Sequence, residues 1–182
     1  MPHLTGKQVA IIAGDYFEEP ELLVPRDALR ESGADVKVYS VDGQPIQATQ
    51  GDVNPTQKVD VDGTFDDVDP AAIDALVVPG GSVNADHLRM DEKAQALLRA
   101  VDDAGKPLAI ICHGPWLLVS AGKASGRRVT SWPSLADDLR NAGADWVDEE
   151  VVVDGNLITS RKPDDLDAFV GAIGNALVGA EV

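Results

Sequence analysis

The chain contains one cysteine, Cys112, and its surroundings favour nucleophilic chemistry. It follows the apolar run 109–111 and precedes the segment His113-Gly114-Pro115. A sharp turn from a buried strand into a helix presents the nucleophile in many α/β enzymes, and a helix amino terminus lowers a thiol pKa. A small buried hydrophobe at a strand end is the alternative interpretation. The adjacent histidine favours a reactive thiol.

Three histidines, His3, His87 and His113, limit the partners open to this thiol. A Cys–His pair requires one of them within hydrogen-bond reach. Glutamine amidotransferases and α/β-hydrolases take their histidine from late in the chain, and no histidine follows residue 113 here. We therefore expect His113 to be the partner, with a purely structural role in the turn as the alternative.

An acidic segment follows the first apolar run, and Glu18 is its candidate for chemistry. Residues 8–14 are rich in branched apolar side chains and end at Gly14, as in a strand buried on both faces of a parallel sheet. A carboxyl after such a strand can lean over Cys112 and share a proton with it. Acidic residues also favour helix starts, so both roles are open to Glu18.

The motif Pro79-Gly80-Gly81 ends another apolar run and supplies candidates for an oxyanion hole. Glycine adopts conformations that other residues avoid, so Gly80 and Gly81 can expose their amides beside that of His113. A plain turn is the alternative. Glycine-rich phosphate-binding patterns and metal-ligand spacings are both missing from the sequence, which therefore predicts no cofactor and no metal.

The elements that must position these residues alternate between strand and helix. We expect strands at 8–14, 35–43, 73–81 and 106–112, helices at 20–32, 91–104, 113–122, 134–142 and 163–179, a hairpin within 44–70, and two short strands meeting at Asp154-Gly155. Pro25 should bend or delay the first helix, and Asp91 should cap another. The alternation predicts a three-layer α/β fold whose parallel strands end side by side.

Length and charge narrow the possible partners and compartment. The 182 residues fit a single domain, 1–182, with residues 1–6 as a loose amino terminus. A formal charge of -16 disfavours nucleic acid and anionic membranes as partners. The sequence shows no secretory leader and no apolar run of about 18 residues. With one cysteine, it predicts a protein of a reducing, cytoplasmic compartment.

Four segments together resemble the PfpI family of intracellular cysteine peptidases: DYFEEPELLVP, DALVVPGG, KPLAIICHGPWLLVSAG and VTSWPSLADDLRNAGADWVDEEVVVDGNLITSRKPDDL. This family belongs to the superfamily of the Parkinson-associated protein deglycase. The resemblance implies a flavodoxin-like sandwich, related to class I glutamine amidotransferase domains, with a nucleophile elbow. It implies that Cys112 is the nucleophile, that His113 is its neighbour, and that Glu18 is the early glutamate that contacts the cysteine.

The resemblance also implies a shared site between subunits. In this branch of the family a third acidic residue reaches in from the adjacent subunit, and the segment 86–89 supplies Asp86 as the candidate. The stretch SVNADHLR (82–89) is one residue longer than the usual spacing after Pro-Gly-Gly, which leaves His87 as the alternative. We therefore expect a homodimer or a hexamer. Trp116, on the helix after the elbow, either lines the pocket or packs in the core.

Three functions are compatible with this family and one reactive thiol. The first is a cofactor-free glyoxalase or deglycase that acts on methylglyoxal, a small aldehyde, or on its adducts. The second is hydrolysis of peptides through the same thiolate. The third is a stress protein whose cysteine senses peroxide without catalysis. We favour the first because the sequence reveals no separate groove for an extended peptide.

Overall fold

A seven-stranded sheet forms the centre of the chain, as a computed structural model of residues 1–179 shows. The strands lie in the order β11-β12-β8-β7-β1-β3-β6, and every neighbouring pair is parallel except β11 and β12. Their bounds are Gln8–Ile12 (β1), Asp35–Ser40 (β3), Gly63–Thr64 (β6), Ala75–Val78 (β7), Leu108–Ile111 (β8), Val151–Asp154 (β11) and Leu157–Ser160 (β12). The predicted α/β fold with a mostly parallel sheet is confirmed.

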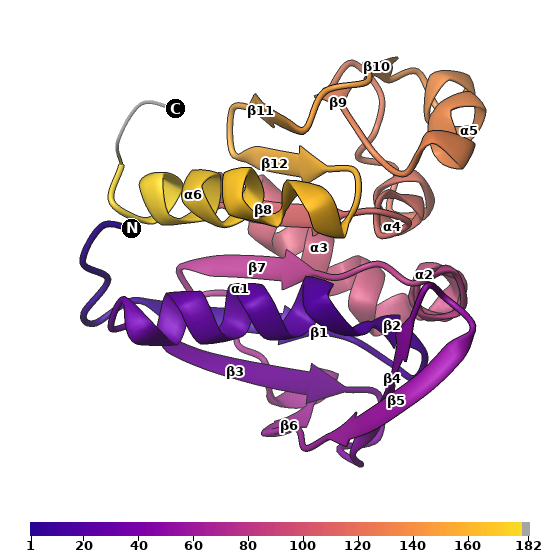
Figure 1. The fold of residues 1–182 in the computed structure, drawn as a ribbon. Helices are drawn as coiled ribbons and strands as arrows, with labels where there is room; N and C mark the ends of the chain where they lie inside the picture. The colour runs from indigo at the N-terminus through magenta and orange to yellow at the C-terminus, as the bar shows by residue number, and fades with distance from the viewer. Residues whose placement is uncertain (180–182) are drawn as a thin grey trace.

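Helices cover both faces of this sheet, which gives the expected three layers (Figure 1). The helices α1 and α6 pack together on one face, while α2, α3, α4 and α5 contribute to the core on the other. Their bounds are Glu19–Glu31 (α1), Ser82–Met90 (α2), Glu92–Asp103 (α3), Pro115–Ser120 (α4), Ala136–Asn141 (α5) and Leu166–Leu177 (α6). Short 3-10 turns at Phe65–Asp67, Pro133–Leu135 and Pro163–Asp165 complete the helical elements.

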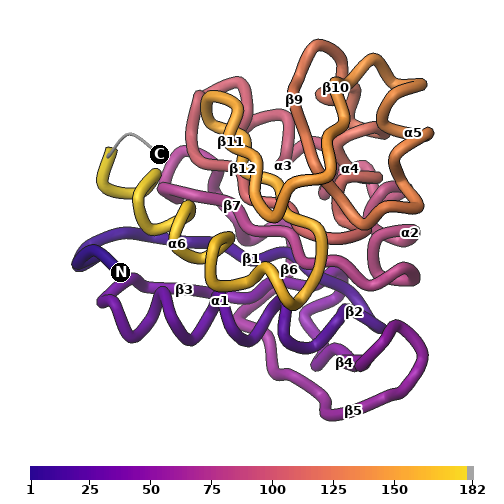
Figure 2. The backbone as a smooth tube through the Cα atoms, turned by 45° about the horizontal axis from the view of Figure 1, so that its top comes forward, coloured from indigo at the N-terminus to yellow at the C-terminus, as the bar shows by residue number. Residues whose placement is uncertain are grey.

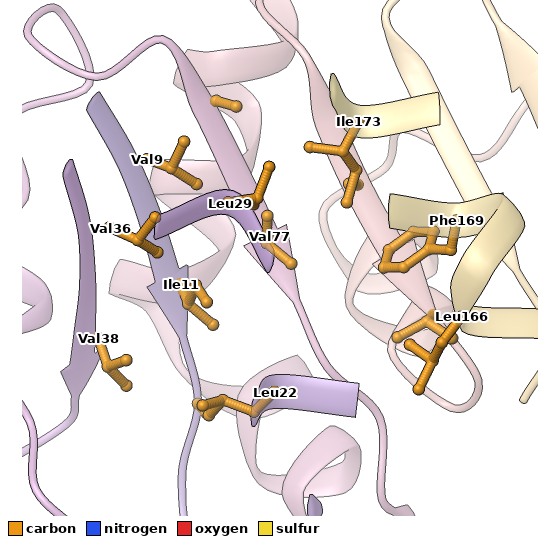
Figure 3. Packing of buried hydrophobic residues seen from close by; sticks show 14 of the residues in the cluster. Val9, Ile11, Leu22, Leu29, Val36, Val38, Val77, Leu166, Phe169 and Ile173 are labelled. Carbon is orange, nitrogen blue, oxygen red and sulfur yellow. The ribbon is translucent and has the colours of Figure 1, made fainter. Parts of the chain in front are cut away.

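The core explains why the central strands read as continuous apolar runs. In β1, Ile11 belongs to the hydrophobic cluster under α1 and α6, whereas its neighbour Ile12 belongs to the cluster on the opposite face. Alternate side chains of a strand point to opposite faces, so both must be apolar when helices cover both faces. Figure 3 shows Leu29 of α1 and Phe169 of α6 packed over Val77 and its neighbours.

The strands that carry the candidate chemistry are neighbours. Strand β7 lies between β1 and β8, so the carboxyl ends of these three strands meet at one edge, as expected. The expected hairpin also forms, from β4 (Ile46–Gln50) and β5 (Asn54–Val59), and it joins β2 (Phe17–Glu18) in a small second sheet. Figure 2 shows this hairpin projecting beyond the main sheet. Two further short strands, β9 (Arg128–Val129) and β10 (Asp145–Trp146), pair beside α5.

Several local expectations are corrected by the structure. The amino terminus is not loose, because the side chain of Leu4 is buried and its N–H donates to the Ser32 carbonyl at 2.7 Å. Pro25 does not delay the first helix, which begins at Glu19 and continues past it to Glu31. The helix α2 was not expected. The cap at Asp91 is confirmed, since its Oδ1 accepts from the amides of residues 93 and 94. No helix within residues 1–179 is long and apolar enough to cross a membrane.

Truncation of Phe169 should test the contribution of the α6 face to stability. Its ring is fully buried in the cluster shared with α1, so Phe169→Ala leaves a cavity and should lower the free energy of unfolding by about 3–5 kcal/mol. Urea unfolding followed by circular dichroism measures this loss. The matched control is Val41→Ala, whose side chain is 55% exposed and should cost little. Equal losses in the two variants would contradict this description of the core.

Candidate active site

Cys112 lies at a strained elbow between β8 and α4. Its backbone has a φ of 63°, in the left-handed region that non-glycine residues rarely adopt. The Cys112 N–H donates to the Ser160 carbonyl at 3.0 Å, and the Cys112 carbonyl accepts from the Trp132 N–H at 2.9 Å. Both neighbouring segments therefore hold this conformation in place. Such strain is concentrated at functional sites, and the expected elbow is present.

His113 lies directly beside the sulfur. Its Nδ1 is 3.3 Å from Cys112 Sγ, and the residue is buried. Two indole rings fix the imidazole from its sides: the Trp132 ring is stacked with a centroid distance of 5.9 Å, and the Trp116 ring is tilted at 5.5 Å. Trp132 was not among the residues predicted for the site, although it lies shortly after the end of a strand, β9, as the other candidates do. Trp116, half-buried, contacts the imidazole as well as the core.

The carboxyl that lies against the thiol is Glu21, not Glu18. The Glu21 side chain is fully buried, and its Oε2 accepts from the Gly80 N–H at 2.8 Å. Its other oxygen, Oε1, has no N–H or O–H partner among the described residues, and the carboxyl interacts with the Cys112 thiol. Burial raises the pKa of Glu21 to about 8. Glu21 therefore keeps its proton at neutral pH and can share it with the sulfur.

Glu18 has a different set of partners, so the expected contact with Cys112 is wrong. Its Oε1 accepts from the Gly51 N–H and its Oε2 from the Asp52 N–H, both at 2.9 Å. Glu18 lies just before α1, whereas Glu21 lies on the buried face of that helix with Leu22. The sequence did contain a signal for Glu21, because an acidic residue on the apolar face of an amphipathic helix is unusual. Buried acidic residues are rare unless they have a partner or a function.

The Pro-Gly-Gly turn brings the backbone against the thiol. A Cβ added at Gly80 would stand 2.6 Å from both the Cys112 Cβ and Glu21 Oε2, so only glycine fits. The Gly80 N–H is already occupied by Glu21, and the backbone amide of Gly81 lowers the pKa of the Cys112 thiol against the effect of burial. Gly80 is therefore not free to serve an oxyanion as expected. The His113 N–H, next to Gly80, remains a candidate donor.

Asn84, on α2, holds this turn in position. Its Nδ2 donates to the Pro79 and Gly80 carbonyls at 3.1 and 2.9 Å, and its Oδ1 accepts from the Gly14 N–H at 2.7 Å. This buried amide therefore ties the end of β1 to the turn after β7. The sequence does not reveal this role, because asparagine within a helix carries no distinctive spacing signal.

The electrostatic surroundings favour a neutral site at rest. Burial raises the pKa of the Cys112 thiol, and the charge of Glu21 raises it further when that carboxyl is ionised. The expectation of a thiol pKa lowered by the helix amino terminus is therefore wrong for this chain in isolation. Burial lowers the pKa of His113, while the charges of Asp52 and Glu18 oppose that change. A neutral imidazole can accept a proton from the thiol.

Asp86 and His87 lie away from this cluster. Both are exposed on α2, and the acidic groups that act on His113 from within the chain are Asp52 and Glu18 instead. Within the described residues, no group of three or more His, Cys, Asp or Glu side chains is arranged to hold a metal ion. The site therefore consists of a thiol, an imidazole and a protonated carboxyl in direct contact.

Comparison with known proteins identifies the family. The family model described as DJ-1/PfpI family matches residues 7–176. The chain belongs to the DJ-1/PfpI family. A deglycase of Pyrococcus abyssi is 45% identical over 163 residues, which cover 90% of this chain and 95% of the relative. General stress protein 18 of Bacillus subtilis is 41% identical over 166 residues, covering 90% and 94%.

The fold comparison gives the same result. The crystal structure of Drosophila melanogaster DJ-1beta superposes with a TM-score of 0.87 at 31% identity, covering 95% of this chain and 91% of that one. The resemblance inferred from the sequence is thus confirmed. The names of the relatives support enzymatic activity in the DJ-1/PfpI family, in deglycation among other reactions.

The pH dependence of stability should reveal the buried proton of Glu21. Because its pKa rises from 4.5 to about 8 on folding, the folded chain retains this proton where the unfolded chain has lost it. The resulting stabilisation is fully present below about pH 4.5 and is lost as the pH rises towards 8. Glu21→Gln cannot ionise, so at pH 8 it should be more stable than the wild type, by about 1–4 kcal/mol.

Urea unfolding of both proteins between pH 5 and pH 8.5 measures this effect. The difference in stability should grow with pH. Glu19→Gln, on the same helix but partly exposed, is the matched control and should show no such growth. A constant difference between Glu21→Gln and the wild type across this pH range would contradict a raised pKa at Glu21.

Proposed function

We propose that this chain is a cofactor-free glyoxalase or deglycase that acts on methylglyoxal or its adducts through Cys112. One observation carries the proposal: the buried thiol lies between two proton carriers, with His113 Nδ1 at 3.3 Å and the carboxyl of Glu21 in contact. Isomerisation of a dicarbonyl needs a nucleophile and groups that move protons. The deglycase among the relatives supports this choice.

The first step is addition of the thiol to the aldehyde. The Cys112 proton passes to His113 Nδ1, and the sulfur forms a bond to the aldehyde carbon as its C=O π bond opens. The resulting alkoxide takes a proton and becomes a hemithioacetal. The backbone N–H of His113 lies next to Gly80 and close to Cys112, where it can donate a hydrogen bond to the developing oxyanion.

The second step moves a proton between the two carbon atoms of the substrate. A base removes the hydrogen of the hemithioacetal carbon, and the neighbouring ketone carbon receives a proton through an enediol. The first carbon is oxidised to a thioester while the second is reduced to an alcohol, so no external oxidant is needed. Water then releases lactate and the free thiol. His113, neutral again after it returns its proton to the alkoxide, suits the role of the base that carries the hydrogen between the two carbon atoms. Glu21, protonated at rest with a pKa of about 8, can give a proton to the ketone oxygen as the enediol forms and take one back as the thioester carbonyl forms.

Lactate formation from methylglyoxal tests this function. The wild type should produce lactate, and Cys112→Ala should lose at least a hundredfold in rate because no other thiol is present. His113→Gln should also lose most of its rate, whereas the exposed His87→Gln serves as the matched control and should retain it. An enzymatic lactate assay, run under single-turnover and steady-state conditions, measures the rates of the wild type and of each variant.

A parallel assay with a fluorogenic peptide separates the peptidase alternative. If the wild type cleaves the peptide through Cys112 but forms no lactate, the glyoxalase and deglycase proposal is wrong. Lactate formation that persists in Cys112→Ala contradicts it equally.

We propose further that the protein forms a homodimer, alone or within a hexamer, in which Asp86 approaches the site of a second copy. The outer face of α2 supports this proposal, because Asp86 is exposed there together with the apolar side chains of Val83 and Met90, which are 37% and 67% exposed. Exposed apolar side chains around a charged residue are typical of an interface.

Mixing two inactive variants tests the shared site. If Asp86 acts across subunits, co-expressed Cys112→Ala and Asp86→Ala chains form heterodimers in which one of the two sites has all its residues. Random pairing then restores roughly a quarter of the wild-type rate per chain. Sedimentation velocity establishes the assembly in the same samples. A mixed sample no more active than the average of its parents would contradict a role for Asp86 across subunits.

A further inference from the structure

The tip of the β4–β5 hairpin is fastened beside the active site. Both oxygens of Glu18 accept backbone N–H groups of this tip, from Gly51 and Asp52 at 2.9 Å each. The Glu18 side chain is buried, and its own N–H donates to the Gly80 carbonyl at 3.4 Å. Figure 1 shows the hairpin running from the edge of the main sheet up to α2. A distant part of the sequence is thus fixed next to the Pro-Gly-Gly turn.

Asp52 points from this tip towards the turn that contacts the thiol. Its Oδ1 accepts from the Ser82 N–H at 2.8 Å, at the first residue of α2. The backbone amide of the preceding residue, Gly81, lowers the pKa of the Cys112 thiol against the effect of burial. A Cβ at the adjacent Gly80 would stand 2.6 Å from the Cys112 Cβ. The amide that holds Asp52, at Ser82, therefore belongs to the residue directly after Gly81, whose amide acts on the nucleophile. The second oxygen, Oδ2, makes no hydrogen bond within the described part of the chain, so it is available for an electrostatic role.

The backbone of Asp52 is itself unusual. Its φ is 65°, and only two other non-glycine residues among those described have a positive φ, namely Tyr16 and Cys112. All three surround the same turn, since the Tyr16 carbonyl would stand 2.5 Å from a Cβ at Gly81. Glycine would adopt this conformation at no cost, whereas aspartate tolerates it with some strain. Strain of this kind is maintained where the side chain has a use.

The charges facing His113 come from this same region. Asp52 and Glu18 raise the pKa of the imidazole against the effect of burial. The Cys112 sulfur lies 3.3 Å from Nδ1, and the Glu21 carboxyl acts on the same sulfur. From α2, the guanidinium of Arg89 lies over the Trp116 ring at 5.4 Å, and the same ring contacts the imidazole at a centroid distance of 5.5 Å. Among the described residues, the charges that act on the imidazole are therefore Asp52 at the hairpin tip and Glu18, which holds that tip.

We infer that Asp52 is the acidic positioning residue for His113, supplied by the same chain, and that Glu18 holds the hairpin so that this charge stays at the site. The inference rests on the proposed use of Cys112 and His113 as a pair. When the thiol proton passes to Nδ1, the imidazole becomes a cation in a buried position. A nearby carboxylate stabilises that cation, as the acidic member of a triad does, without taking up a proton itself.

The experiment uses Asp52→Asn, which removes the charge but keeps an oxygen for the Ser82 N–H and a side chain that tolerates a positive φ. Because the chain has three histidines, NMR titration of the imidazole Cε1–H signals resolves each pKa, with His113→Gln to assign the signal. Loss of the Asp52 charge should lower the pKa of His113.

A matched variant removes a charge elsewhere beside the hairpin. Asp15→Asn changes a carboxylate that also accepts an amide of the hairpin, from Gln47 at 2.7 Å. It should leave the pKa of His113 unchanged. An unchanged His113 pKa in Asp52→Asn, or an equal shift in Asp15→Asn, would overturn the inference. The titration does not require lactate formation, so failure of the proposed reaction is recognised separately.

Discussion

The hydrogen bond from the Gly80 N–H to the buried carboxyl of Glu21 is the contact on which the site depends. It joins the buried face of α1 to the turn after β7, and the same turn presses against the Cβ of Cys112. Any side chain at residue 80 would push the turn away from α1 and from the elbow, because its Cβ would stand 2.6 Å from Glu21 Oε2 and from the Cys112 Cβ. The doubly covered parallel sheet supplies the frame in which helix, turn and elbow meet at one edge.

This arrangement has a cost that the rest of the fold must offset. The buried carboxyl of Glu21 has one oxygen without an N–H or O–H partner among the described residues, and Cys112, Tyr16 and Asp52 adopt left-handed backbone conformations. Each feature destabilises the folded state by an amount on the order of 1 kcal/mol or more. The two apolar clusters on the faces of the sheet oppose this loss. The core and the site thus have opposite effects on stability, as is common where local rules are violated for function.

The sequence predicts the elements well because strands covered on both faces read as apolar runs, and the elbow follows from the position of Cys112 after such a run. The prediction from sequence fails where contacts between distant parts of the chain determine the position of a side chain. Glu18 looked closer to a strand end than Glu21, yet the helical turn brings Glu21 inward and leaves Glu18 facing the hairpin. Leu4 lacked any periodic pattern and is nevertheless buried. Asp52 carries no local signal, since only tertiary folding brings the hairpin tip to α2.

The acidic groups around the thiol suggest how its reactivity is controlled. Ionised carboxyls near Cys112 oppose thiolate formation, so the sulfur is activated only if its proton moves to His113 while Glu21 remains protonated. The negative charge at Asp52 and Glu18 acts more favourably on the imidazole, because it stabilises the cation that this transfer creates. The same carboxylates therefore disfavour the thiolate while His113 is neutral and favour the ion pair once the proton has moved to His113. A buried thiol that ionises only with its partner is protected from adventitious oxidation, because the thiolate is the species that oxidants attack.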